Sequence, residues 1–311
     1  MLKGRLGLET ARIPHADRHG CIWLARGGLT VEDGTLRFTT AGGAGLAPGS
    51  YGIPFQTVSA ILLEPGTTVS HDALRLLARN GTGLVVTGED GVRFYASLPS
   101  GRDESALARA QVRFWSDEEK RRTIARRMYA RRLGEILPSA DLNVLRGIEG
   151  ARVRVLYRTL ARQFGIQWAG RNYDREDPEA TDLVNQAVNH ASAAIRAAAM
   201  IAVAATSTIP QLGFIHEDSA AAFCLDIADL FRESVCIPAA FRAVRQFESD
   251  PSQPLERHAR RWAGRSLHHD KVIPSMIDAI KVLLGDEGSP PSTPTESGGT
   301  SRGTASASPA P

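Results

Sequence analysis

The spacing of apolar residues changes near residue 100, and this change most limits the folds open to the 311-residue chain. Before it, short apolar runs alternate with polar residues and end at turn residues, which is typical of β-strands. After it, apolar residues recur every three or four positions over long segments, which is typical of helices. Leu98-Pro-Ser-Gly-Arg102 joins the two patterns. We therefore predict an α and β protein of two domains, with a β-rich domain over 1–100 and a larger all-α domain over 101–284.

The first domain is predicted to be β-sandwich-like with one helix. Two alternating strands over 29–38 surround Asp33-Gly34, a pair that adopts positive φ at little cost. Ser70 is placed to cap a helix that stops at Asn80-Gly81. The other strands are predicted at 21–25, 51–55, 58–63, 84–87 and 92–95.

The second domain is predicted to consist of long helices. The segment with the clearest ends should begin at Ser139, after a proline, and stop at Gly165. The expected helices span about 105–133, 139–164, 180–205, 218–235, 238–248 and 254–284. From 285 to 311 the chain has no large apolar residue, so it cannot bury enough surface to fold, and we expect a disordered tail.

Composition places the chain among ordinary globular proteins. Hydrophobic residues make up 42% and charged residues 23% of the sequence. No apolar run approaches the roughly 18–20 residues that cross a bilayer. Cys21, Cys224 and Cys236 are scattered and show no metal-binding spacing. We expect them to be reduced thiols of a cytoplasmic protein.

The net charge of +3 is unevenly distributed along the chain. Residues 101–162 carry 15 basic and eight acidic side chains, whereas residues 163–311 carry 13 basic and 18 acidic ones. This arrangement suits a polyanion that lies across an acidic centre. A solvated arginine-rich helix would give the same counts, so charge alone leaves both interpretations open.

Glu149 is the strongest single signal for a functional site. At about 100° per residue, it falls at the centre of an apolar helical stripe. An unpaired carboxylate buried there would cost several kcal/mol, so we expect it to be paired, protonated or bound to a cation. A salt bridge to Arg146 or Arg152 is one alternative, while Gly147 and Gly150 favour a bound ion because they leave room beside the carboxylate. Its apolar neighbours on the stripe are Leu142, Leu145, Val153, Leu156 and Leu160.

A histidine and two aspartates form a second group. His216 ends an apolar segment, and Asp226 and Asp229 follow one helical turn apart. Taken singly, these residues would be a hydrogen-bonded loop histidine and the solvated face of a surface helix. Together with Glu149 they are ligand types that suit Mg²⁺ or Mn²⁺ and disfavour a structural zinc site. Such an ion in an arginine-rich protein indicates phosphodiester chemistry.

The segments that hold these residues resemble the CRISPR-associated integrase family, the DNA-inserting subunit of the adaptation complex, in its type I-E form. The likeness continues over 88–93 and 168–174 and so covers nearly the whole chain except the tail. The segments that carry it are LRGIEGARVR at 145–154, GFIH at 213–216, LDIADL at 225–230 and LEPGTTVSH at 63–71.

The resemblance implies a metal-dependent DNA integrase and endonuclease that inserts short DNA fragments, or spacers, into a repeat array. It implies a homodimer that assembles with a small ferredoxin-like companion protein and acts on double-stranded fragments and repeat-array DNA. By this likeness Glu149, His216 and Asp229 would ligate Mg²⁺ or Mn²⁺, and Asp226 would be a supporting catalytic acid.

The resemblance also marks basic residues for DNA contact. Arg93 would touch DNA, and Arg232 would be a basic neighbour of the catalytic centre. We also assign Arg146 and Arg152, which flank Glu149, to DNA binding. The chain departs from the family pattern at Arg196, where a tyrosine is expected.

Two other functions fit parts of the same pattern. A branched-DNA or junction nuclease of DNA repair would use the same chemistry. A non-catalytic DNA-binding scaffold belongs to another class, but it has no reason to place Glu149 inside an apolar stripe.

Overall fold

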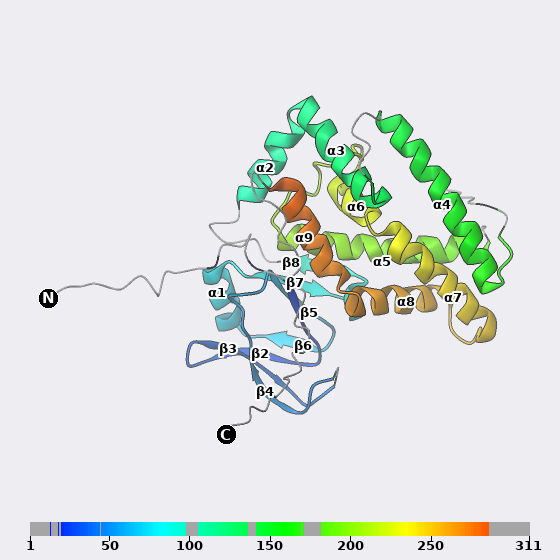
Figure 1. The fold of residues 1–311 in the computed structure, drawn as a ribbon. Helices are drawn as coiled ribbons and strands as arrows, with labels where there is room; N and C mark the ends of the chain where they lie inside the picture. Colours follow the sequence, from blue (N-terminus) through cyan, green and yellow to red (C-terminus); the bar gives the residue numbers. More distant parts are fainter. Residues whose placement is uncertain are drawn as a thin grey trace, which may run out of the picture.

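The chain folds into a strand-rich part followed by a larger helical part, which confirms the predicted fold class (Figure 1). The computed structural model describes residues 13, 18, 20–43, 45–97, 105–135, 141–168, 170 and 182–285. The predicted tail beyond Gly285, the predicted linker and Ser139 lie outside these residues. The helix predicted to begin at Ser139 begins at Leu142, because the Asp141 side chain accepts the Asn143 amide and is the N-cap.

The strand-rich part contains two four-stranded sheets and the helix α1 (His71–Asn80). Asp33 and Gly34 have φ of 49° and 74°, as the hairpin between β2 and β3 requires. The Ser70 hydroxyl accepts a hydrogen bond from the Ala73 amide at 3.2 Å, which confirms the predicted cap. One sheet is ordered β1 (Cys21–Leu24), β5 (Ala60–Leu63), β7 (Gly83–Thr87) and β8 (Phe94–Ser97), and the other β4 (Gly49–Gly52), β3 (Thr35–Thr40), β2 (Gly27–Glu32) and β6 (Thr67–Val69).

Strand β5 joins the two halves of the molecule because both of its faces are buried. Ile61 and Leu63 pack into the core between the two sheets. Ala60 and Leu62 face the other way, into the core of the helical part. Side chains alternate across a strand, so one sheet serves as a wall of both cores. The strand-rich part is thus fixed against the helices.

The helical part is built around α5 (Leu183–Ala205), which contacts α6, α7, α8 and α9. Although α5 is long and apolar enough to span a membrane, 61% of its most apolar window is buried inside the structure. It is therefore the central helix of the helical part. The other elements are η3 (Glu89–Gly91), α2 (Ser105–Trp115), α3 (Glu118–Leu133), α4 (Leu142–Phe164), α6 (Ala222–Asp229), a π-helical turn η4 (Arg232–Cys236), α7 (Ile237–Ser249), α8 (Leu255–His269) and α9 (Val272–Leu284).

Three predicted helices are interrupted, because apolar periodicity continues across local breaks. Between α2 and α3, the Asp117 carboxylate accepts the amides of Glu119 and Lys120, both at 3.1 Å, and starts a new helix. Lys271 has a φ of 50° and separates α8 from α9. The segment predicted at 218–235 becomes α6 and η4, and neither Asp218 nor Ser219 is its N-cap.

Glu64, which follows β5, gives a first testable prediction. Its Oε1 is buried and has no hydrogen-bond partner in the described part of the chain. Burial raises the pKa of Glu64 to about 7; a hydrogen bond from the Asp90 backbone opposes this shift, and the carboxylates of Asp90 and Glu89 add to it. Because the folded-state pKa is raised, the stabilising contribution is present below the ordinary value of 4.5 and is lost as pH rises through about 7.

Glu64→Gln should therefore raise the thermal midpoint at pH 8 and raise it much less at pH 5. Thermal unfolding at both pH values checks this expectation. Glu32→Gln is the control, because the Glu32 side chain is 59% exposed. An equal shift at the two pH values would show that ionisation of Glu64 is not the cause.

Candidate metal centre and nucleic-acid interface

A tight loop ahead of α6 wraps around the Asp226 carboxylate. A Cβ at Gly213 would lie 2.2 Å from the His216 carbonyl oxygen, so only glycine permits this close turn. The amides of Phe214, Ile215 and His216 donate to Asp226 at 2.5, 3.1 and 3.0 Å. The Asp226 side chain is fully buried. The alternative of a solvated acidic face is therefore wrong for Asp226, because the loop covers it.

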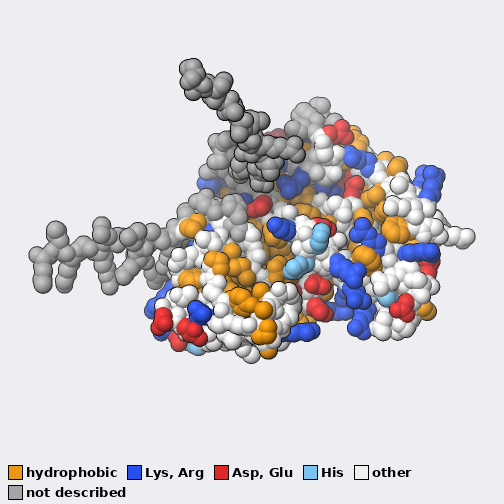
Figure 2. All heavy atoms as spheres, turned by 60° about the horizontal axis from the view of Figure 1, so that its bottom comes forward, with side chains coloured by type: hydrophobic (Ala, Val, Ile, Leu, Met, Phe, Trp, Pro, Cys, Tyr) orange, Lys and Arg blue, Asp and Glu red, His pale blue; other side chains and the backbone are white. Residues whose placement is uncertain are grey.

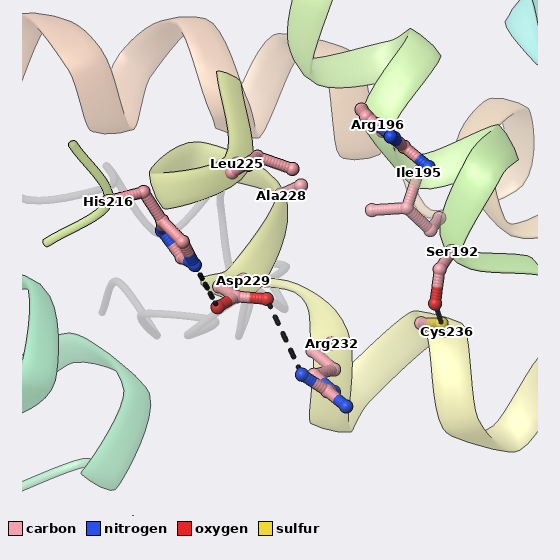
Figure 3. Close-up of a pocket in the computed structure, with 9 residues that line it drawn as sticks. All are labelled: Ser192, Ile195, Arg196, His216, Leu225, Ala228, Asp229, Arg232 and Cys236. Atoms are coloured by element: carbon pink, nitrogen blue, oxygen red, sulfur yellow. Dashed lines mark hydrogen bonds and ion pairs between the residues drawn. The ribbon is translucent and has the colours of Figure 1, made fainter. Parts of the chain in front are cut away.

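Asp226 also fixes the His216 ring. Its Oδ1 lies 2.7 Å from His216 Nδ1, and this hydrogen bond is the main cause that raises the pKa of His216, against the opposing effect of burial. With Nδ1 engaged, the Nε2 atom points at Asp229, whose Oδ2 lies 3.9 Å away (Figure 3). A carboxylate on one ring nitrogen commonly orients the other toward a ligand.

Asp229 lines a cavity of about 250 Å³. In Figure 3, His216 and Arg232 flank it on opposite sides, and Arg232 Nη1 lies 3.8 Å from its Oδ1. Arg232 begins the π-helical turn, a type of distortion often found at functional sites. Arg196 of α5 lines the same cavity. Asp229, Arg232 and Arg196 thus line the same cavity.

Glu149 pairs with Arg132 of α3, and not with Arg146 or Arg152 as the salt-bridge alternative predicted. The Arg132 side chain is only 4% exposed, and its Nη1 lies 3.7 Å from Asp229 Oδ2. Burial raises the pKa of Glu149; the guanidinium of Arg132 opposes this effect, and the charge of Asp229 adds to it. One buried guanidinium therefore lies between the two carboxylates.

The two arginines that flank Glu149 have other partners. Arg146 lies beside the Tyr129 side chain and opposes the rise that burial causes in the pKa of Tyr129. Arg152 donates to the Leu133 carbonyl at 2.5 Å and lies 3.6 Å from Glu135. Their role in DNA binding stays a prediction.

The chemistry of the donors fits a divalent ion, but the present geometry does not form a ligand cage. An imidazole nitrogen and two carboxylates suit Mg²⁺ or Mn²⁺. Among the described residues, however, no three His, Cys, Asp or Glu side chains are grouped closely enough to hold a metal. Arg132 fills the space between Glu149 and Asp229. The ligand roles of Glu149, His216 and Asp229 therefore remain predictions.

Arg93 lies in a second and larger cavity, of about 590 Å³, between β8, α5 and α8. Its Nη2 is 3.7 Å from Glu256. Arg260 and Arg196 also line this cavity, and Arg196 is shared with the first one. On the face shown in Figure 2, Lys and Arg side chains form a band beside histidine and acidic side chains. Neither Arg132 nor Arg260 was predicted from the sequence, nor was it predicted that Arg196 lines both cavities.

Comparison with known sequences defines the class of protein. The pattern of the family described as CRISPR associated protein Cas1 matches residues 22–137 and 130–259. The chain is 37% identical over 285 residues to the CRISPR-associated endonuclease Cas1 of Escherichia coli (strain K12), covering 91% of each chain. It is 36% identical over 283 residues to that of Geobacter sulfurreducens, covering 91% of this chain and 90% of the relative. The chain therefore belongs to the Cas1 family of CRISPR-associated endonucleases.

Solved structures agree with this assignment. The chain superposes on the crystal structure of the TtCas1–DNA complex with a TM-score of 0.76 and 30% identity, covering 88% of this chain and 99% of that one. A casposase bound to its integration product shares the fold, with a TM-score of 0.57 and 13% identity. The predicted family is confirmed.

Proposed function

We propose that the protein is a metal-dependent DNA integrase of the type I-E form, which inserts short DNA fragments into a repeat array. One observation carries this proposal: Glu149, Asp229 and His216 Nε2 approach a single space that already holds a cationic group. A buried position that accommodates positive charge between two carboxylates suits a divalent ion. Family membership and the TtCas1–DNA complex support the choice of DNA as the substrate.

Each residue of the centre has a distinct task in this proposal. Glu149, Asp229 and His216 would hold Mg²⁺ or Mn²⁺, which when bound stabilises the charge that develops on an attacked phosphodiester. Asp226 would hold the proton on His216 Nδ1, so that Nε2 keeps its lone pair for the ion. Arg232, beside Asp229, would meet a phosphate oxygen. The nucleophile would be a DNA 3′-hydroxyl for joining, or water for cleavage.

The second cavity gives the DNA a path to the centre. Arg93, Arg196 and Arg260 converge there, and guanidinium groups hold phosphates without reading sequence. Since Arg196 lines both cavities, a strand that passes along it would lead from one to the other. As partners we propose a second copy of this chain, a small ferredoxin-like companion, and fragment and repeat DNA, all in the cytoplasm.

Arg196→Ala should weaken DNA binding by removing about one phosphate contact. Arg196 is exposed, and its side chain forms no hydrogen bond or ion pair with another described residue, so replacing it with alanine should not disturb the fold. The slope of log affinity against log salt should become less steep by about 0.9. Arg75→Ala is the control, because Arg75 lies on α1 and is 58% exposed. Equal salt slopes for Arg196→Ala and the unmodified protein would remove Arg196 from the DNA path.

A strand-transfer assay tests the proposed function. A labelled DNA fragment with a free 3′-hydroxyl is mixed with supercoiled repeat-array DNA, the protein and its companion, with Mn²⁺ or with EDTA. Covalent joining at the repeat edge with Mn²⁺ only is the expected result. Cleavage of branched DNA with no joining would favour the junction nuclease, and DNA binding with neither reaction would favour the scaffold.

A further inference from the structure

We infer that Arg132 is a resident counter-cation of the metal centre, which a divalent ion must displace in order to bind. The inference rests on the proposed function, because it requires that Glu149, His216 and Asp229 hold an ion. It assigns a role in metal loading to a residue of α3, outside the segments that supply the three ligands.

The contacts of Arg132 involve the same atoms that an ion would need. Its Nη2 pairs with Glu149 Oε1, and its Nη1 lies 3.7 Å from Asp229 Oδ2. Asp229 Oδ2 is also the atom that His216 Nε2 faces, at 3.9 Å. An ion bound by Glu149 Oε1, Asp229 Oδ2 and His216 Nε2 would therefore lie where the guanidinium now lies. The two cations exclude each other.

Arg132 lacks one of the hydrogen bonds that a buried arginine usually forms. Its side chain is 4% exposed, and its Nε is buried and has no hydrogen-bond partner among the described residues. The guanidinium also lies 5.7 Å from the centre of the Tyr129 ring, within reach of a cation–π interaction. A buried N–H without a partner costs free energy, and such groups are rare in folded proteins. A buried arginine whose only role is structural would usually have all of its N–H groups paired. The two carboxylates hold the group in place despite this cost.

Two neighbouring carboxylates need a cation between them. Without a cation, Glu149 and Asp229 would face each other as like charges in a half-buried site. Arg132 places a positive charge between the two carboxylates, in contact with Glu149 and 3.7 Å from Asp229. The same contact lowers the apparent affinity for a divalent ion, because only the fraction of molecules with Arg132 displaced can bind it.

Mn²⁺ titration by calorimetry on the full-length protein without DNA tests this competition. Arg132→Gln should lower the Kd for Mn²⁺ by about tenfold or more, since the competing cation is gone. Arg131→Gln is the matched control: it removes the same charge from the adjacent, exposed position and should change the Kd by less than about twofold. Arg132→Lys keeps the charge but cannot span both carboxylates, so it should give an intermediate Kd, and it serves as the test if Arg132→Gln does not fold.

The outcomes separate this inference from the proposed function. Equal Mn²⁺ affinity in the Arg132 and Arg131 variants would overturn the inference and leave the metal centre intact. Weaker binding by the Arg132 variants would also overturn it, because Arg132 would then support the ion and not compete with it. If neither the unmodified protein nor any variant binds Mn²⁺, the proposed metal centre itself fails.

Discussion

Asp226→Ala should produce the largest loss of both stability and activity of any single change at the centre. The alanine leaves the amides of Phe214, Ile215 and His216 without an acceptor. One hydrogen bond to a charged acceptor is worth about 1.5–3 kcal/mol, so the free energy of unfolding should fall by more than about 3 kcal/mol. Strand transfer should be lost as well, because nothing then orients the His216 ring.

Urea unfolding and a strand-transfer assay on the same preparation measure the two effects. Asp218→Ala is the matched control, since Asp218 is an exposed aspartate close to the same loop, and it should change stability by less than about 0.5 kcal/mol. Asp226→Asn should fall between the two, because the amide retains one acceptor oxygen. Full stability in Asp226→Ala would mean that the three amides find other acceptors and that Asp226 does not organise the loop.

Glu149→Gln should abolish strand transfer and also destabilise the metal-free protein. The amide cannot balance the buried guanidinium of Arg132, and removing one partner of such a pair typically costs about 3–5 kcal/mol. Asp229 still lies 3.7 Å from Arg132, so we expect the lower end, about 3 kcal/mol. Without Arg132 the expectation would be the reverse, because a neutral amide would then replace an unpaired buried charge.

A double-mutant cycle checks this explanation. Unfolding curves are measured for Glu149→Gln, Arg132→Gln and the combined variant, all in EDTA. The combined variant should recover most of the lost stability, because no charge is left unpaired. If the two single changes simply add, the ion pair does not carry the stability of this site.

The elements with local signals could be predicted from the sequence. Ser70, the Asp33-Gly34 turn and Gly165 each act within a few residues of the chain, and each has the predicted geometry. The helix breaks at Asp117 and Lys271 were missed because the apolar period continues through them. The side-chain cap at Asp117 and the left-handed backbone at Lys271 each interrupt the helix, although the apolar spacing continues.

The centre was harder to predict, because its contacts join distant segments. The apolar stripe predicted that Glu149 is enclosed, and its side chain is 16% exposed. Its partner Arg132 follows Met128 by four positions on the buried face of α3, so the helical period of that segment indicates that Arg132 is enclosed. Asp226 was assigned to a solvated face in one interpretation because periodicity within α6 cannot show that a preceding loop folds over the helix.

Anomalous diffraction from crystals soaked in Mn²⁺ tests the central claim most directly, because it locates the ion without reference to activity. We predict one anomalous peak bounded by Glu149, Asp229 and His216 Nε2, with the Arg132 guanidinium moved out of that space and the peak absent in Glu149→Gln crystals. Mn²⁺-dependent strand transfer by a protein whose crystals show no peak at these three residues, or sustained Mn²⁺-dependent strand transfer by Glu149→Gln, would contradict the centre described here.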